Sequence, residues 1–298
     1  MTVRLHGFAD AAGPARRLAH RLGIGFRGIG LHHFPDGESR VRVGPTAARA
    51  VLYQPLHQPN ARLLDVLLAA SALRDRGAGH LTLVAPYLGY MRQDRAFRPG
   101  EAVSQRVVGR LIAAAFDALV TVDPHLHRTP RLEQVAPGIQ AITVRAAPAI
   151  VAHLRGRLSP RTIIVGPDSE SRPWVEAVAV PLGLDWLVAS KRRQGDRRVM
   201  ITLPAGTRLG GRPALIVDDL LASGGTVLAC ADALRAAGAR RVGAVASHCL
   251  AGADDLVRLK AAGVSPVLAS DSVPGPAGRI VLADTLAAAI RDAGLDGA

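Results

Sequence analysis

Short apolar runs alternate with longer amphipathic stretches along the whole chain of 298 residues. Short apolar runs between turn residues are typical of buried strands, and apolar residues three and four positions apart are typical of helices. Gly77, Gly183 and Gly238 follow three of the helical stretches, as glycine often does at helix ends. The pattern predicts strands over residues 50–53, 81–85, 119–122, 163–165, 186–189, 215–217, 242–246 and 267–269, and helices over 61–76, 104–115, 173–182 and 226–237.

This alternation of strands and helices predicts an α/β fold whose sheets are mainly parallel and covered by helices on both faces. The two halves of the chain echo each other, because strand 119–122 runs into Asp123 and strand 215–217 runs into Asp218. We therefore expect two similar domains in tandem, over residues 1–142 and 143–298. Ligands of such sheets bind beyond the carboxyl ends of the strands, so we expect the ligand-binding residues to follow the strands.

Composition narrows the possible partners. The chain is 49% hydrophobic and 20% charged, which is typical of a globular protein, and only 3% of its residues are aromatic, too few for a base-stacking platform. The net charge of +13 comes almost wholly from arginine, since lysine occurs only at Lys191 and Lys260. Without a long basic run or a basic tail, this charge favours small phosphate-bearing ligands over nucleic acid.

Two isolated cysteines, Cys230 and Cys249, form neither a disulfide framework nor a zinc cluster, and we expect them to pack as small apolar residues. The sequence has no signal-peptide pattern and no apolar run long enough to span a membrane. We therefore predict a cytoplasmic protein that does not contact membranes.

The most informative stretch is residues 216–226, Ile-Val-Asp-Asp-Leu-Leu-Ala-Ser-Gly-Gly-Thr. An apolar strand ends in two carboxylates, and a turn of small residues then opens a helix. Glycine lets the backbone approach an anion closely, and a helix amino terminus offers N–H groups and a positive dipole. A plain strand followed by a helix capped by Ser223 would also fit, but adjacent carboxylates need partners. The stretch lacks the Gly-Lys-Ser/Thr of a Walker loop.

This stretch resembles the phosphoribosyl-binding loop shared by phosphoribosyltransferases and ribose-phosphate pyrophosphokinases. Four further segments resemble the pyrophosphokinases alone, and they occur in the order found in that family. They are Phe-Pro-Asp-Gly-Glu at 34–38, Tyr-Leu-Gly-Tyr-Met-Arg-Gln-Asp-Arg at 87–95, Val-Asp-Pro-His at 122–125 and Lys-Arg-Arg at 191–193. The chain is thereby identified, by resemblance over residues 34–274, as a divergent ribose-phosphate pyrophosphokinase with two phosphoribosyltransferase-like domains.

The resemblance implies that ATP binds to the first domain. The ring of Phe34 would lie against adenine, and Arg92 and Arg95 would grip phosphates. The implied ATP-binding residues are Phe34, Asp36, Glu38, Arg92, Gln93, Asp94, Arg95 and His125. In this family the first of these segments is typically lent by a neighbouring subunit, so a homo-oligomer, at least a dimer, is also implied.

The resemblance places ribose 5-phosphate and the reacting groups in the second domain. Lys191 and Arg193 would be catalytic, and the retention of lysine in so arginine-rich a chain suggests a need for a compact ammonium group. His125 and Asp168 would hold Mg²⁺, although Mg²⁺ ordinarily prefers oxygen ligands to histidine. The implied ribose 5-phosphate residues are Asp218, Asp219, Ser223, Gly224, Gly225 and Thr226.

Two departures keep alternatives open. The family usually has Asp-Thr-Ala-Gly-Thr where this chain has Ala222-Ser-Gly-Gly-Thr, a form closer to adenine phosphoribosyltransferases. Pro-Asp-Val-Gly-Gly becomes Pro-Asp-Ser-Glu-Ser at 167–171, which should stiffen a loop near the phosphates. The alternatives are a phosphoribosyltransferase acting on a nucleobase and a non-catalytic homologue that regulates an active partner.

Overall fold

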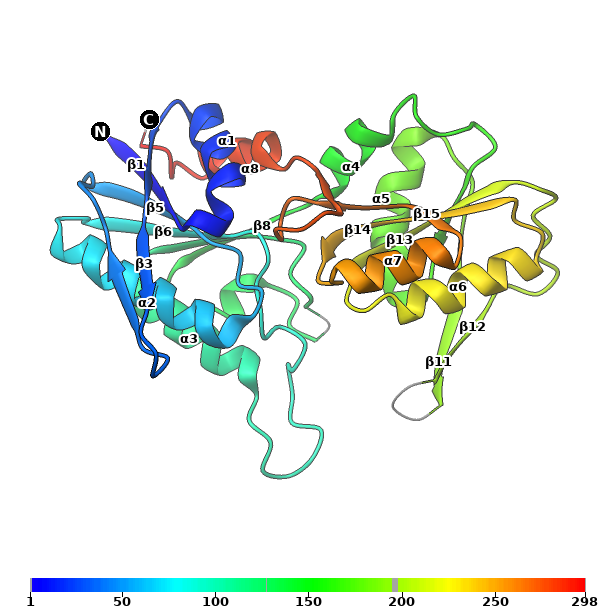
Figure 1. The fold of residues 1–298 in the computed structure, drawn as a ribbon, viewed down its shortest axis with the longest axis horizontal. Helices are drawn as coiled ribbons and strands as arrows, with labels where there is room; N and C mark the ends of the chain where they lie inside the picture. The colour runs from blue at the N-terminus through cyan, green and yellow to red at the C-terminus, as the bar shows by residue number, and fades with distance from the viewer. Residues whose placement is uncertain (1, 127, 195–197, 298) are drawn as a thin grey trace. The chain divides into compact units, whose positions relative to one another are not determined.

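The computed structural model describes residues 2–126, 128–194 and 198–297, and the chain forms two compact units (Figure 1). The first unit comprises Met1–Arg145 together with Leu282–Ala298, and the second comprises Ala146–Val281. The predicted boundary at 142/143 lies three residues from the first of these divisions. The assignment of residues 282–298 to the second domain differs from the structure, because the last helix packs on the first and Asp284 pairs with Arg21 at 2.8 Å.

The first unit is built on a six-stranded sheet in which every neighbouring pair is parallel. Helices α2 and α3 lie on one face of this sheet and α1 and α8 on the other (Figure 1). In sheet order the strands are β2 (Gly25–Gly28), β1 (Val3–Gly7), β5 (Arg49–Tyr53), β6 (His80–Ala85), β7 (Ala118–Val122) and β8 (Gln140–Val144). The helices are α1 (Ala12–Leu22), α2 (Pro59–Asp75), α3 (Ser104–Ala115) and α8 (Ala283–Asp292), with 3₁₀ turns η1 (Ala9–Ala11) and η2 (Leu132–Gln134) and a hairpin of β3 (Gly30–His33) and β4 (Ser39–Arg42).

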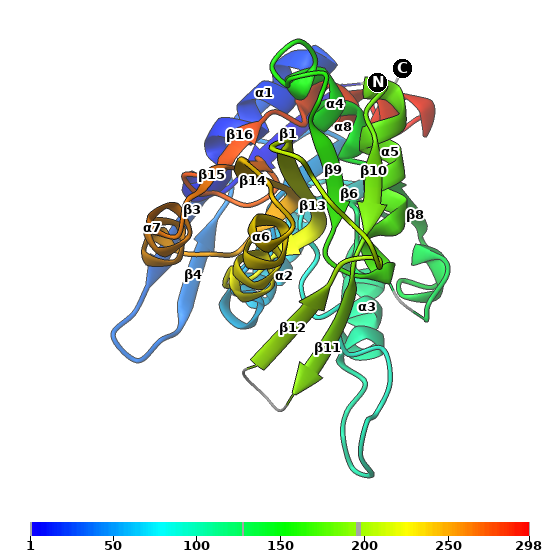
Figure 2. The same ribbon diagram turned by 90° about the vertical axis from the view of Figure 1, so that its right-hand side faces the viewer.

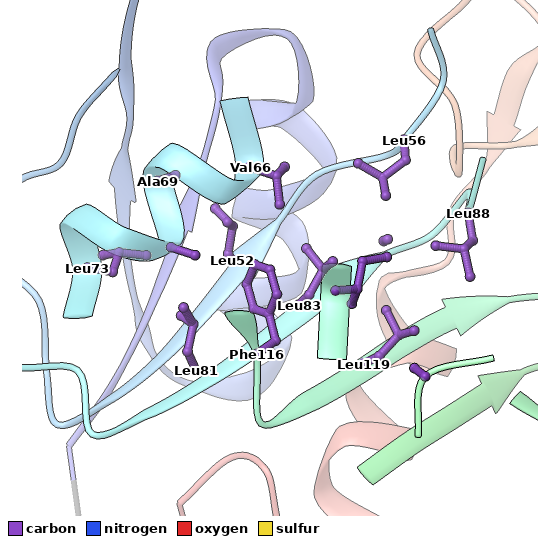
Figure 3. Packing of buried hydrophobic residues seen from close by; sticks show 14 of the residues in the cluster. Leu52, Leu56, Val66, Ala69, Leu73, Leu81, Leu83, Leu88, Phe116 and Leu119 are labelled. Carbon is purple, nitrogen blue, oxygen red and sulfur yellow. The ribbon is translucent and has the colours of Figure 1, made fainter. Parts of the chain in front are cut away.

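The core under α2 shows why this sheet forms (Figure 3). Leu81 and Leu83 are two positions apart on β6 and therefore point to the same face of the sheet. They pack with Leu52 of β5, Leu119 of β7 and the apolar face of α2, and all of these side chains are fully buried. Each such leucine contributes about 1.5–3 kcal/mol of transfer free energy, so this layer supplies a large part of the stability of the unit.

The second unit repeats the plan of the first. Its six-stranded parallel sheet has the order β10 (Trp186–Val188), β9 (Ile163–Gly166), β13 (Pro213–Leu221), β14 (Arg241–Cys249), β15 (Val264–Ser270) and β16 (Gly278–Ile280). A hairpin of β11 (Ser190–Gln194) and β12 (Arg198–Thr202) follows the second strand, as β3 and β4 do in the first unit, and projects away from the sheet (Figure 2). The helices are α4 (Ala147–Leu154), α5 (Arg172–Leu182), α6 (Gly225–Ala236) and α7 (Ala253–Ala261), with the 3₁₀ turn η3 (Ser169–Ser171).

The prediction of two tandem α/β domains with mainly parallel sheets is confirmed. The predicted helix over 104–115 coincides with α3, and Gly183 ends α5 with a φ of +64°, as expected of a helix-ending glycine. The described part of the chain contains no helix that is both long and apolar enough to cross a membrane.

Candidate active site

The predicted phosphate loop lies at the carboxyl edge of the second sheet, with one correction. The carboxylates Asp218 and Asp219 were predicted to follow the strand, whereas β13 continues through both of them to Leu221. The extension occurs because β14 is equally long and pairs with β13 as far as Leu221 and Cys249. The turn is therefore short, and α6 begins at Gly225.

Gly224 allows this turn. Its φ of +80° is in the left-handed region, which residues with a Cβ rarely adopt. A Cβ at this position would also lie 3.0 Å from the side chain of Leu259 on α7. Ser223 is exposed beside it, and α6 starts immediately afterwards. The backbone N–H groups at the start of α6 and the hydroxyls of Ser223 and Thr226 make this turn suitable for a phosphate group.

Three carboxylates gather behind the turn. Burial, followed by the charges of Asp219 and Asp168, raises the pKa of Asp218 well above its usual value, and the opposing effect of Lys191 is smaller. The charges of Asp218 and Asp168, together with burial as the largest cause, also raise the pKa of the Cys230 thiol to about 12. This cluster therefore has more negative charge than its neighbours neutralise, and it favours ligands that donate hydrogen bonds or carry positive charge.

Asp168 connects this cluster of carboxylates to a cation, the ammonium group of Lys191. One carboxylate oxygen accepts hydrogen bonds from the backbone N–H groups of Glu170 and Ser171, at 3.1 and 3.2 Å. The other lies 3.2 Å from Nζ of Lys191, and both side chains of this pair are less than one-fifth exposed. Ser171 closes the turn by donating from its hydroxyl to the Asp168 carbonyl at 2.6 Å. Of these hydrogen bonds, only the one from the Ser171 hydroxyl depends on the Ser-Glu-Ser departure, and the predicted stiffening stays a prediction.

The hairpin β11–β12 carries the predicted catalytic residues. Lys191 lies on β11 opposite Ile201 of β12, and its side chain reaches back to Asp168 after strand β9. Arg193 is on the same strand, but its side chain lies outside what the structure describes. Strands β9 and β13 are neighbours in the sheet. The Lys191–Asp168 pair therefore lies at the same sheet edge as the turn at Ser223–Thr226, which we call the phosphate turn.

In the first unit, the segment Phe34–Glu38 forms the tip of the β3–β4 hairpin. Phe34 N–H donates to the Glu38 carbonyl at 2.8 Å, and Asp36 accepts from the Glu38 N–H at 3.1 Å, so the motif builds its own turn. The side chains of Phe34, Asp36 and Glu38 are exposed. The ring of Phe34 is flanked by the ring of His32 at 4.7 Å and the guanidinium of Arg40 at 5.7 Å.

The segment Tyr87–Arg95 follows β6, and its polar residues divide into two groups. Arg92 and Arg95 are exposed, and Arg95 lies over the ring of Phe97 at 5.0 Å. Gln93 instead accepts a hydrogen bond from the Ser104 hydroxyl at 3.2 Å and so ties the segment to the start of α3.

Asp94 is buried and has an internal partner that the sequence did not reveal. Its carboxylate accepts from the backbone N–H of Arg128 at 3.1 Å and from the Arg128 guanidinium at 3.0 Å. Burial alone would raise the pKa of Asp94, but these hydrogen bonds outweigh it and lower the pKa. Arg128 follows β7, the neighbour of β6, so the pair binds two carboxyl-edge segments together. The carboxyl-edge rule points to this segment, but not to the pairing.

His125 also lies after β7 and is partly exposed. Asp123, two residues earlier, has a φ of +34°, and its N–H donates to the Val144 carbonyl at 2.9 Å, which turns the chain sharply at the strand end. The predicted competitor of His125, His127, lies outside the described residues.

The carboxylates of the second unit suit a magnesium ion. The part of the chain that the structure describes has no ready-made group of three or more His, Cys, Asp or Glu ligands. Mg²⁺ usually needs only one or two carboxylates and takes its other ligands from phosphates and water. Burial, and after it the charges of Asp219 and Asp168, raise the pKa of Asp218, and a nearby cation would stabilise its ionised form.

Comparison with known proteins accounts for both units. Residues 9–115 match the family model for the N-terminal domain of ribose phosphate pyrophosphokinase, and residues 144–265 match the phosphoribosyl transferase domain. A crystal structure of phosphoribosylpyrophosphate synthetase from Mycobacterium smegmatis has the same fold, with a TM-score of 0.81 and 24% identity over 98% of this chain and 99% of that one.

Two curated relatives extend the match along nearly the full length. The ribose-phosphate pyrophosphokinase of Methanopyrus kandleri is 34% identical over 93% of this chain and 94% of its own. The ribose-phosphate pyrophosphokinase of Pyrococcus furiosus is 31% identical over 85% of this chain and 88% of its own. Together with the site at the edge of the second sheet, these matches show that the chain belongs to the ribose-phosphate pyrophosphokinase family.

Proposed function

We propose that the chain transfers the β,γ-pyrophosphoryl group of ATP to the C1 hydroxyl of ribose 5-phosphate, giving phosphoribosyl pyrophosphate and AMP. The observation that carries this proposal is the Lys191–Asp168 pair beside the phosphate turn. A turn for a sugar phosphate alone would serve a transferase equally well. A cation held at the same sheet edge on a projecting hairpin is what phosphoryl transfer requires in addition.

Ribose 5-phosphate would bind across the carboxyl edge of β13. Its phosphate would lie on the turn Ser223–Thr226, where N–H groups and hydroxyls converge. Its ribose hydroxyls would donate hydrogen bonds to Asp218 and Asp219. Such donors stabilise the ionised carboxylates, so substrate binding should lower the raised pKa of Asp218.

The reaction needs positioning and charge neutralisation more than covalent chemistry. The C1 hydroxyl would lose its proton to water as its oxygen attacks the β-phosphorus. The bond from the β-phosphorus to the oxygen that bridges it to the α-phosphorus would break, and AMP would leave with that oxygen. Lys191 would exchange Asp168 for a phosphate oxygen as negative charge builds on the transferred group, and Arg193 would assist from the same strand. Mg²⁺, where bound, neutralises phosphate charge. Asp168 is its proposed ligand in the second unit, and the role of His125 rests on the resemblance alone.

ATP would use the predicted residues of the first unit, namely Phe34, Asp36, Glu38, Arg92, Gln93, Asp94, Arg95 and His125. The exposed Phe34–Glu38 tip supports the proposal that this segment serves a neighbouring subunit of a homo-oligomer. The internal pairing of Asp94 with Arg128 supports a different role for Asp94, that of holding the segment in place for Arg92 and Arg95. We also propose a cytoplasmic location.

The test is to identify the products formed from ATP, ribose 5-phosphate and Mg²⁺. The proposal predicts equal amounts of AMP and phosphoribosyl pyrophosphate, without ADP. Release of pyrophosphate that depends on an added nucleobase would instead identify a phosphoribosyltransferase. Nucleotide binding without turnover, with stimulation of an active homologue, would identify a regulatory protein.

A further inference from the structure

Helix α7 contacts the phosphate turn through two successive residues, Arg258 and Leu259, which lie 35 positions along the chain from Ser223 and Gly224 respectively. Leu259 is fully buried, and a Cβ at Gly224 would lie only 3.0 Å from its side chain. Arg258, the residue before it, donates from Nη2 to the backbone carbonyl of Ser223 at 2.7 Å. One contact supports the turn from below, and the other holds one of its peptide groups.

Arg258 is itself held by the start of its own helix. Its Nη2 also lies 2.7 Å from one carboxylate oxygen of Asp255. The second oxygen of Asp255 accepts the backbone N–H of Gly252 at 3.2 Å, which caps α7. The guanidinium is thus fixed between a helix cap and the phosphate turn, in a geometry suited to charge-assisted hydrogen bonds.

The Ser223 carbonyl determines where the next N–H points. The peptide group between Ser223 and Gly224 is planar and trans, so its C=O and N–H point in opposite directions. Holding the carbonyl toward Arg258 therefore directs the Gly224 N–H away from α7. The Gly224 carbonyl is fixed in turn, because it accepts the first hydrogen bond of α6, from Leu228 N–H at 2.9 Å. Both peptides around Gly224 are oriented before any ligand arrives.

We propose that Arg258 is a positioning residue for ribose 5-phosphate: it orients the Ser223–Gly224 peptide so that the turn receives the 5-phosphate without rearranging. The inference rests on the proposed function, since it concerns the same sugar-phosphate turn. Preorganised donors bind an anion more tightly than donors that must first be ordered. Arg258 should therefore affect the binding of ribose 5-phosphate, and not the chemical step or the binding of ATP.

The chain contains a matched control. Arg235 on α6 has the same arrangement, with Nη1 paired to Asp232 three residues earlier at 3.1 Å and Nη2 donating to the Ala262 carbonyl at 2.5 Å. Both arginines are partly exposed, but Arg235 holds the end of α7 and not the phosphate turn. Arg258→Ala and Arg235→Ala therefore remove similar interactions at different places.

The experiment measures the dissociation constant of ribose 5-phosphate by calorimetry without ATP, and then KM and kcat in the full reaction. Arg258→Ala should weaken ribose 5-phosphate binding about tenfold, as expected for a lost charge-assisted hydrogen bond. Its kcat and its KM for ATP should stay within about threefold. Arg235→Ala should change none of these quantities, and Arg258→Lys should recover part of the affinity. The loss should persist at high ionic strength, where simple attraction between exposed charges is screened.

Equal ribose 5-phosphate affinity in Arg258→Ala and Arg235→Ala would overturn the inference. So would a loss that disappears at high ionic strength, because that result would make Arg258 a source of attraction and not of orientation. If the wild-type protein did not bind ribose 5-phosphate at all, the proposed function itself would fail, and the inference would fall with it.

Discussion

The two units share one sheet order but differ at the turn that follows the third strand in sheet order. In the second unit, β13 leads through Gly224 into α6, and in the first unit, β5 leads through Gln58 into α2. Both residues precede the helix with a positive φ, +80° for Gly224 and +51° for Gln58. The first helix then begins with Pro59, which has no N–H to offer a ligand, whereas the second begins with Gly225.

The charged side chains around the two turns also differ. Where the second unit has the partly neutralised group of Asp168, Asp218 and Asp219, the first has an ion pair between Asp10 and Arg62 at 2.8 Å. Gln54 donates to Asp10 at 3.4 Å, so this carboxylate is already satisfied. One sheet order therefore has two different turns: the second unit combines glycine with carboxylates whose charges are only partly neutralised, and the turn of the first unit has neither.

Lys191→Ala should have the largest effect, because the first unit has no lysine and Lys191 pairs with a carboxylate of the cluster behind the turn. We expect kcat to fall by about 10³-fold or more, as for other cations that stabilise phosphoryl transfer. Ribose 5-phosphate affinity should change little. Steady-state kinetics and direct binding measure the two quantities separately.

The other lysine of the chain provides the control. Lys260 is exposed on α7, and Lys260→Ala should leave both kcat and KM unchanged. Near-normal turnover in Lys191→Ala would show that the cation is not catalytic.

Exchanging the two turn residues should have the next largest effect. Gly224→Gln introduces a Cβ at a φ of +80° and 3.0 Å from Leu259, so the turn must shift. A left-handed conformation costs a residue with a Cβ about 1–2 kcal/mol, which predicts a rise of about tenfold or more in KM for ribose 5-phosphate. The reciprocal Gln58→Gly should leave that KM unchanged and alter the free energy of unfolding by no more than about 1 kcal/mol. An effect of Gln58→Gly on KM as large as that of Gly224→Gln would undo the comparison.

Asp218→Asn should separate stability from function in the second unit. The folded pKa of Asp218 lies above the unfolded value of 3.8, so its ionisation opposes folding. Stability is therefore lost as pH rises from 3.8 to the folded pKa. At neutral pH the substitution should raise the melting temperature of the ligand-free protein, by about 2–4 °C for each kcal/mol relieved, while it weakens ribose 5-phosphate binding. Calorimetric scans at acid and neutral pH measure this, and a lower melting temperature at neutral pH would show that Asp218 is well compensated.

The first unit should respond to pH in the opposite direction. Burial, with Arg4 and Arg27, lowers the pKa of His6 to about 4. The unfolded chain therefore binds a proton at higher pH than the folded chain, and stability falls as pH drops from 6.5 toward 4, by about 3 kcal/mol at most from this residue. His6→Leu should remove this part of the acid sensitivity.

Two probes follow the units separately in the intact protein. Both tryptophans, Trp174 and Trp186, lie in the second unit, so their fluorescence reports that unit, whereas circular dichroism reports the whole chain. On acidification, the loss of circular dichroism should precede the change in fluorescence. The reverse order would contradict the assignment of acid sensitivity to the first unit.

Local patterns predicted the elements well where short-range signals determine them. The helix over 104–115 was predicted to the residue, because its apolar periodicity ends at a clear boundary before strand β7. The extension of β13 through Asp218 could not be predicted, because it depends on pairing with β14. The return of α8 to the first unit depends likewise on tertiary packing, with Arg21 and Asp284 far apart in the chain.

The site was predictable as a set of residue types and not as a set of contacts. The motifs identified Lys191 and Asp168 separately, but their pairing became evident only in the folded chain. Asp94 was predicted to touch ATP, and its hydrogen bonds to Arg128 were not foreseen, because a partner 34 residues away leaves no local signal. Arg258 was missed for the same reason, since it contacts the turn 35 residues away in the chain.

Titration of ribose 5-phosphate into the intact protein tests most directly the claim that only the second unit retains the ligand turn. The predicted result is one binding site per chain, whose affinity Gly224→Gln weakens about tenfold or more and Gln58→Gly leaves intact. Two sites per chain, or one site that survives Gly224→Gln with unchanged affinity, would contradict it.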